Sequence, residues 1–201
     1  MQKYSVFSLI KNAFTDHQNW EVAWKDPTPK SEYDVVIIGG GGHGLATAYY
    51  LAKEHNITNV AVIEKGWIGG GNVGRNTTII RSNFMYDANA RFNEFGMDLW
   101  RNLSQELNFN VMFSPRGIIN LAHSDAQMNA YARRGNSMRL NGIDAKLLNR
   151  DEVKKLIPMA DFSDEVRFPI FGGLMQPSAG TARHDGVAWG YARQADSMGV
   201  D

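Results

Sequence analysis

The segment from Gly39 to Gly44 holds the residues whose types and spacing most directly predict a binding chemistry. It fits the pattern G-x-G-x-x-G, in which the first glycine permits a tight turn and the second lets the backbone approach a pyrophosphate. The third glycine lets the following helix pack against a strand, and the N–H groups at the start of that helix face the anion. The pattern predicts a dinucleotide site formed mainly by the backbone of Gly39, Gly41, Gly42, His43 and Gly44.

The residues around this segment predict the β-α-β unit that such a site requires. Residues 33–38 form an apolar run without alternation, which is typical of a strand buried on both faces of a parallel sheet. An alanine-rich helix is expected over 45–55 and a second strand over 59–64. Glu64 ends that strand, where a carboxylate can accept hydrogen bonds from a ribose. This context favours a dinucleotide site over the alternative, a glycine-rich turn without a ligand.

A second glycine-rich segment, residues 66–81, follows Glu64 directly and favours FAD over NAD. It is rich in glycine, amide and hydroxyl side chains and is too polar for a core. Such a segment can wrap the diphosphate and isoalloxazine of a flavin, whereas an NAD dehydrogenase would normally continue into the next βα unit. The alternative is an ordinary surface loop, although loops often carry function.

The remaining pattern predicts an α/β protein with an FAD-binding dinucleotide (Rossmann-like) fold and part of a second, mixed-sheet substrate domain. Helices are expected over 7–14, 87–107, 126–140, 150–156 and 185–198, and strands over 117–121 and 167–174. The expected domains are an N-terminal extension (1–30), an FAD-binding region (31–112), the start of the substrate domain (113–175) and an incomplete return to the FAD-binding domain (176–201).

Two of these expected helices, and the segment with Trp20 and Trp24, carry more detailed predictions. Trp20 and Trp24 lie one helical turn apart, and Phe92, Phe95, Leu99, Leu103 and Leu107 would form one buried stripe of the helix over 87–107. Asp185 would cap the last helix, and Gly199 would end it. The chain stops where the next strand would begin, so we expect a truncated fold in which Val187, Tyr191 and Met198 form an exposed apolar stripe.

Composition excludes several classes of function. Lys and Arg together number 21, as do Asp and Glu, so the chain lacks the basic surplus typical of duplex-binding proteins. The absence of cysteine excludes disulfides, thiolate metal sites and flavin attachment through cysteine. His17, His55 and His123 show no pairing that predicts a metal site. The apolar runs are too short to span a bilayer, and no signal peptide is recognised, so a cytoplasmic protein is expected.

Five segments resemble the beta subunits of heterotetrameric sarcosine oxidases, which are FAD-dependent amine oxidases. They are GGGGHGLATAYYLAK (39–53), EKGW (64–67), RNTTIIRSN (75–83), FSPRG (113–117) and GTARHD (180–185). The resemblance extends over essentially the whole chain, and family members are considerably longer. Together these motifs are specific, whereas the first alone indicates only FAD or NAD.

The resemblance implies an enzyme that oxidatively demethylates sarcosine (N-methylglycine) to glycine. It implies a non-covalent FAD that oxidises the amine and a covalent FMN that receives the electrons, with oxygen reduced to hydrogen peroxide. The one-carbon unit would go to tetrahydrofolate or be released as formaldehyde. Partners would be the alpha, gamma and delta subunits, with an NAD site in alpha. The alternatives are another FAD-dependent secondary-amine or amino-acid oxidase and a non-catalytic dinucleotide-binding fragment.

The resemblance also implies roles for particular residues. His184 matches the histidine that carries FMN, and Arg81 matches an arginine that holds the substrate carboxylate. Lys65, Asn72, Arg75, Thr77, Thr78 and Ile79 match the stretch that contacts the flavin. Independently, Arg183 and the start of a helix would keep the His184 imidazole neutral and nucleophilic. The alternatives are a surface histidine at 184 and a salt-bridged structural arginine at 81.

Overall fold

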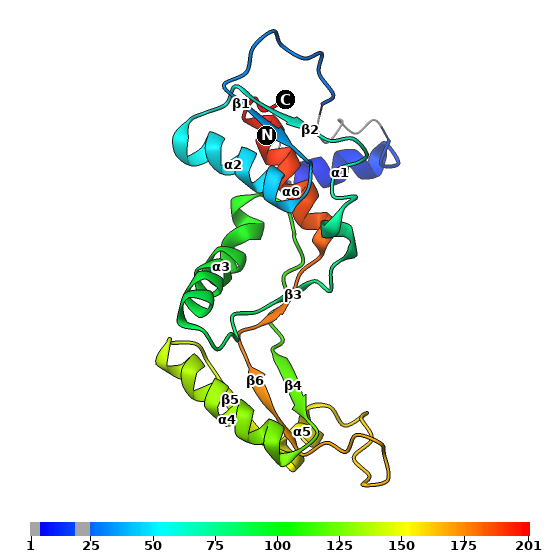
Figure 1. Ribbon diagram of the computed structural model, residues 1–201. Helices are drawn as coiled ribbons and strands as arrows, with labels where there is room; N and C mark the ends of the chain where they lie inside the picture. The colour runs from blue at the N-terminus through cyan, green and yellow to red at the C-terminus, as the bar shows by residue number, and fades with distance from the viewer. Residues whose placement is uncertain (1–4, 19–24) are drawn as a thin grey trace. The chain divides into compact units, whose positions relative to one another are not determined.

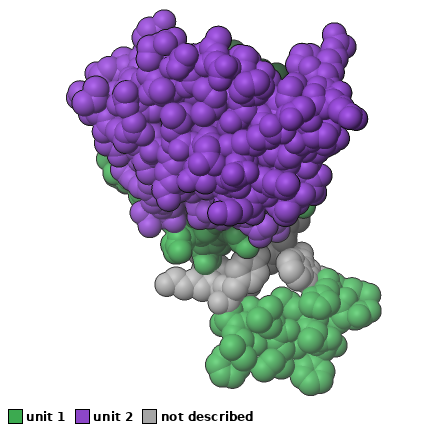
Figure 2. Space-filling model, turned by 90° about the horizontal axis from the view of Figure 1, so that it is seen from below, with its two compact units in different colours: residues 1–77, 104–111, 183–201 green, residues 78–103, 112–182 purple. Residues whose placement is uncertain are grey.

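The computed structural model describes residues 5–18 and 25–201 and divides the chain into two compact units (Figures 1 and 2). The first unit comprises residues 1–77, 104–111 and 183–201, and the second comprises 78–103 and 112–182. The expected helical spacing of Trp20 and Trp24 falls outside the described residues. The domain boundaries expected from the sequence stay a prediction.

The first unit is built on the expected β-α-β unit. Strands β1 (Val35–Ile38) and β2 (Val60–Ile63) pair in parallel, with Val35 opposite Val60 and Ile38 opposite Ile63. Helix α2 (Gly42–His55) connects them. On the other edge of β2, Asp201 donates from its backbone N–H to the Val60 carbonyl at 2.9 Å and accepts from the Val62 N–H at 2.8 Å. The end of the chain therefore aligns with β2 as a further parallel partner.

Helix α6 (His184–Ser197) packs against α2 and completes the core of this unit (Figure 1). Ala48, Ala52 and Ala195 are buried with Val60 and Val200, and these small side chains let the two helices approach closely.

The expectation of an exposed stripe on this last helix was wrong. Val187 and Tyr191 are each only 8% exposed, and Met198 packs against the core. The open apolar face lies on the sheet instead, where Ile38 is 89% exposed and Ile63 is 56% exposed. The expected burial of the first strand on both faces was therefore also wrong, because no helix of the described residues covers that face of β1.

Two further helical segments belong to the first unit. Helix α1 (Val6–Phe14) confirms the expected N-terminal helix and begins with a capping box between Ser5 and Ser8. The 3-10 helix η1 (Asn72–Arg75) lies in the second glycine-rich segment.

The second unit contains a three-stranded antiparallel sheet in the order β4 (Ile118–Ala122), β6 (Gly172–Gln176), β5 (Lys146–Asn149). Helices α4 (Asp125–Leu140) and α5 (Arg150–Leu156) contact it, and β3 (Ile79–Ile80) pairs with β7 (Gly180–Thr181). Side chains of Ser124 and Asn149 cap α4 and α5. The expected helices over 126–140 and 150–156 are thus confirmed.

Two expectations for the second unit differ from the structure. The strand expected over 167–174 begins only at Gly172. Helix α3 (Asp87–Glu106) buries Ala90, Met97 and Leu103, whereas Phe92 is 77% exposed and Phe95 is 64% exposed. The small Ala90 fits the packed core beside Met138 and Leu174, so the phenylalanine stripe faces outward.

Candidate functional site

The glycine loop has the close backbone packing that the motif predicts. Gly39 has a φ of +112°, a conformation that side-chain-bearing residues rarely adopt. A Cβ atom on Gly44 would lie 2.0 Å from the carbonyl oxygen of Gly39, so only glycine fits where α2 begins. The backbone N–H of Gly39 donates to the carbonyl of Ile63 at 2.8 Å, which joins the loop to the end of β2.

The N-terminus of α2 is open to an anion. Gly41 is its N-cap, and no side chain caps the helix. A Cβ on Gly41 would meet only Val73, at 3.9 Å, so a ligand could approach the backbone there. The first N–H groups of a helix have no partner within it, and the helix dipole favours negative charge at this end. These features fit the pyrophosphate of a dinucleotide.

Glu64 connects the two glycine-rich segments. Its Oε2 atom accepts a hydrogen bond from the Gly40 N–H, and its Oε1 atom accepts one from the Gly66 N–H, both at 2.8 Å. These two bonds, with the Gly66 bond the larger influence, hold the pKa of the Glu64 carboxyl below its ordinary value. Each carboxylate oxygen has a further lone pair, so Glu64 can still accept hydrogen bonds from ribose hydroxyls.

The second glycine-rich segment is held against the first. The N–H of Gly69 donates to the Gly40 carbonyl at 2.9 Å, and Gly69 has a φ of +76°. The Val73 side chain would lie 3.1 Å from a Cβ on Gly42. The expected flavin contacts Lys65, Asn72, Arg75 and Thr77 are exposed side chains along or beside this segment. The Gly69–Gly40 hydrogen bond thus brings this polar segment next to the glycine loop.

Three expected site residues, Thr78, Ile79 and Arg81, lie in the second unit. Thr78 has a φ of +59°, and Ile79 begins β3. The Arg81 guanidinium donates through Nη1 to Oδ1 of Asn83 and lies over the Phe84 ring, with Cζ 4.8 Å from the ring centroid.

Sequence reasoning missed the buried polar residues that surround Arg81. Ser82, Asn83 and Gln176 are each 0% exposed and are joined by hydrogen bonds to Glu94, Asn120 and Ser178. The polar pair Ser82 and Asn83 beside Arg81 was the only local signal. Gln176 and Asn120 are distant in the sequence and gave none.

His184 is half-buried at the first residue of α6. The N-cap is Arg183 rather than Asp185, so the expected cap was wrong. Asp185 instead accepts from Arg183 Nε at 2.7 Å and Nη2 at 3.0 Å. This ion pair compensates the Arg183 charge that was expected to act on His184, so the start of α6 is the remaining electropositive feature beside that residue. His184 shares a helix face with Ala188, whose Cβ lies 3.2 Å from a Cβ on Gly69.

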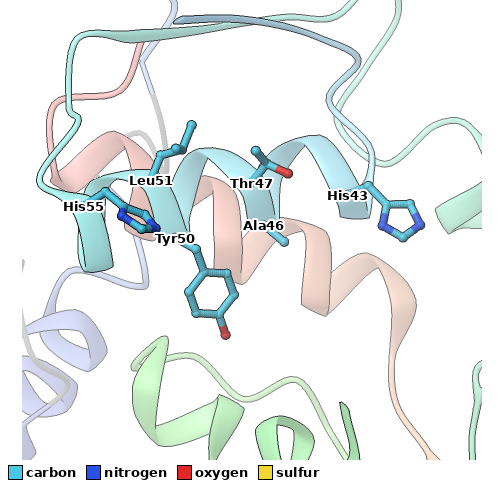
Figure 3. A pocket seen from close by; sticks show the side chains of 6 residues that line it. All are labelled: His43, Ala46, Thr47, Tyr50, Leu51 and His55. Carbon is cyan, nitrogen blue, oxygen red and sulfur yellow. The ribbon is translucent and has the colours of Figure 1, made fainter. Parts of the chain in front are cut away.

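A shallow hollow of about 340 Å³ lies along α2 and shares only His43 with the glycine loop (Figure 3). Its six lining side chains all come from this one helix, with His43 near one end and His55 near the other. They do not bring polar groups together around an enclosed space. The hollow therefore gives no basis for a binding site.

Of the other histidines, His123 has a local structural partner. Across residues 5–18 and 25–201, no group of His, Asp and Glu is arranged to hold a metal ion. The His123 ring nitrogen Nδ1 lies 3.0 Å from the carbonyl oxygen of Phe168, which explains this residue by local structure. Within the same part of the chain, no helix is both long and apolar enough to cross a membrane.

Comparison with known proteins identifies close relatives along the whole chain. The chain is 62% identical over 199 residues to sarcosine oxidase subunit beta of Rhizobium meliloti, covering 99% of this chain and 48% of that protein. It is 52% identical over 181 residues to the protein of the same name from an Arthrobacter species, covering 90% of this chain and 45% of that protein. The chain thus spans about half the length of the curated relatives it matches, and the resemblance found in the sequence is confirmed.

Solved structures and a family model agree on the fold. L-proline dehydrogenase from P. horikoshii superposes with a TM-score of 0.76 at 29% identity, covering 87% of this chain and 44% of that one. Glycine oxidase from Bacillus cereus superposes with a TM-score of 0.73 at 22% identity, covering 85% of this chain and 45% of the glycine oxidase chain. The family model for FAD dependent oxidoreductases matches residues 34–201, which confirms the expected fold class and the preference for FAD. The chain belongs to the FAD dependent oxidoreductase family.

Proposed function

We propose that this chain is the FAD-binding part of a sarcosine oxidase beta subunit. The observation that carries the proposal is the 62% identity to such a subunit over 99% of the chain. The proposed reaction is the oxidative demethylation of N-methylglycine to glycine, with hydrogen peroxide as the reduced product and the one-carbon unit going to tetrahydrofolate or formaldehyde. A cytoplasmic location is part of the same proposal and is tested by cell fractionation.

In this proposal the first unit holds FAD through its backbone. The open N–H groups at the start of α2 bind the pyrophosphate, and Glu64 accepts hydrogen bonds from the ribose. Lys65, Asn72, Arg75 and Thr77 contribute further flavin contacts, and the family resemblance assigns the same role to Thr78 and Ile79. When bound, FAD supplies the acceptor for the hydride equivalent removed from the amine.

Arg81 is proposed to bind the substrate carboxylate. A guanidinium can donate two parallel hydrogen bonds to a carboxylate, and such a pair fixes the orientation of a small substrate. Arg81 is half-buried, and one of its nitrogens is already held by an amide oxygen. The rest of the guanidinium can therefore donate to a ligand.

His184 is proposed as the site of covalent FMN, and the alpha, gamma and delta subunits as the partners. Support comes from the GTARHD match and from the position of His184 on the face of α6 that packs near Gly69. Peptide mass mapping of the assembled enzyme tests the attachment. The expected adduct lies on the peptide that contains His184, and an adduct on another peptide would reject the assignment. His184→Ala should lose covalent FMN and keep dissociable FAD.

The substrate is tested with the complete flavin-loaded enzyme mixed with candidate amines in the absence of oxygen. Bleaching of the flavin absorbance by N-methylglycine, faster than by proline or glycine, is the expected result. Another FAD-dependent amino-acid oxidase is the second candidate, favoured by the structural likeness to L-proline dehydrogenase at 29% identity. Preferential bleaching by proline or glycine would select that candidate, and a flavoprotein bleached by none would contradict both.

A further inference from the structure

Asn83 is a buried polar residue whose side chain hydrogen-bonds directly to Arg81. It is 0% exposed and lies in the second unit. Its Oδ1 atom accepts from Nη1 of Arg81, and its Nδ2 atom donates to Oδ1 of Asn120 at 2.7 Å. Its backbone carbonyl accepts from Arg134, whose Nε is 2.7 Å away and whose Nη2 is also bonded. Both the side chain and the main chain of Asn83 are therefore fixed.

These partners determine which way the Asn83 amide points. A guanidinium has only donors, so the atom facing Arg81 must be the amide oxygen. The amide nitrogen must then face Asn120, which has to present its own oxygen. These donors and acceptors match only when both amides have this orientation. It presents a fixed acceptor to one nitrogen of Arg81.

The acceptor that holds Arg81 carries no charge. In the described ranges, 5–18 and 25–201, no carboxylate forms an ion pair with Arg81. The nearby Arg134 adds a second positive charge, and its pKa is lowered by burial and then by the charge of Arg81. Half-buried guanidinium groups that form no ion pair with a carboxylate favour the binding of an anion.

The main chain at this point is anchored as well. The N–H of Ser82 donates to Oε1 of the buried Gln176 at 3.1 Å, and Oγ of Ser82 donates to Oε2 of Glu94 at 2.5 Å. Phe84 supports the face of the Arg81 guanidinium. The residue after Arg81, the Nη1 nitrogen of Arg81 and the flat face of its guanidinium are thus each held by a different group.

We propose that Asn83 is a positioning residue that orients the Arg81 guanidinium with a neutral amide and so leaves its charge available for a substrate carboxylate. The inference rests on the proposed role of Arg81 in binding that carboxylate. A carboxylate at position 83 would hold Arg81 equally well and would compete with the substrate for its charge.

The test compares Asn83→Asp, Arg81→Ala and the double variant in the complete flavin-loaded enzyme, with N-methylglycine as the substrate. Asn83→Asp nearly preserves shape, and Asn120 can rotate its amide to donate to the new oxygen. We expect KM to rise by roughly tenfold, the scale of one charge-assisted hydrogen bond, with kcat nearly unchanged. Asn83→Asp should add nothing to KM in the Arg81→Ala background, because Asn83 acts through Arg81.

The matched control is Asn102→Asp, the same change at an exposed residue of α3, which should leave KM unchanged. If Asn83→Asp does not fold, Asn120→Ala tests the inference in its place. This variant removes the hydrogen bond that holds the Asn83 amide, so it should also raise KM without lowering kcat. If KM is unchanged in the folded Asn83 or Asn120 variant but rises strongly in Arg81→Ala, the role of Asn83 is wrong and the proposed role of Arg81 stands. Unchanged KM in Arg81→Ala would instead overturn the proposed carboxylate site.

Discussion

Replacing Gly44 by alanine should damage the first unit at the point where α2 meets β1. The new Cβ would lie 2.0 Å from the Gly39 carbonyl oxygen and 3.2 Å from Cγ2 of Ile37. Real Cβ atoms essentially never come closer than 3.0 Å to such an atom, so the start of α2 must move by about 1 Å. The oxygen belongs to the backbone, which cannot rotate away as a flexible side chain would.

Overpacking of this kind costs about 1–3 kcal/mol of unfolding free energy. With a urea m value of about 2 kcal/mol/M, a loss of 2 kcal/mol lowers the unfolding midpoint by about 1 M. The same displacement moves the N–H groups proposed to bind the pyrophosphate, so Gly44→Ala should also lose FAD on dialysis. Urea unfolding followed by circular dichroism, with flavin absorbance before and after dialysis, measures both effects in the complete protein.

The matched control is Gly96→Ala in α3, where the added Cβ meets nothing within 4 Å. Because alanine is a better helix former than glycine, this control should raise stability by about 0.5–1 kcal/mol. A Gly44→Ala protein with an unchanged urea midpoint and full FAD content would refute the reasoning from close packing.

Three other predictions follow from the structure. Glu64→Gln should weaken FAD binding by roughly tenfold, as measured by flavin fluorescence. Because folding lowers the pKa of Glu64, the contribution of this carboxylate to stability is present above the unfolded pKa and is lost as pH falls through the folded pKa. The variant should therefore lose less stability in acid, and an acid unfolding curve identical to that of the unchanged protein would count against this. The 201-residue chain should bind a hydrophobic dye through the open sheet face, and Ile38→Thr with Ile63→Thr should reduce that binding, whereas unchanged binding would place the exposed surface elsewhere. Leu174→Ala, at a fully buried site, should cost about 2–5 kcal/mol in urea unfolding, and a loss below 1 kcal/mol would show that the second unit repacks around the cavity.

The parts of the site that depend on neighbouring residues could be predicted from the sequence. The turn at Gly39 and the packing at Gly44 follow from local spacing, since a strand, a tight turn and a helix leave little freedom. The contact of Glu64 with a ribose stays a prediction, and its bonds to the N–H groups of Gly40 and Gly66 were not expected. The bond between Gly69 and Gly40 places the second glycine-rich segment beside the first, which agrees with the proposed role of both at one flavin.

The remaining features depend on contacts between distant residues, which one sequence does not reveal. Phe92 and Phe95 have the spacing of a buried stripe, yet Ala90 and Met97 fill the core, because packing depends on the shape of the facing elements. Likewise, the side chains of Asn83 and Asn120 are joined by a hydrogen bond within the second unit, and nothing in their sequence spacing indicates that contact.

The packing of α6 on α2 has a consequence for how the chain folds. Ala52 and Ala195 belong to one core, although the whole of the second unit lies between them in the sequence. Closing so long a loop costs entropy that grows with the logarithm of its length, by about 0.6 kcal/mol for each doubling, and distant contacts slow folding. During synthesis, all residues of the second unit leave the ribosome before α6 does. The second unit can therefore form early, while α2 keeps an uncovered side until the last residues of α6 emerge.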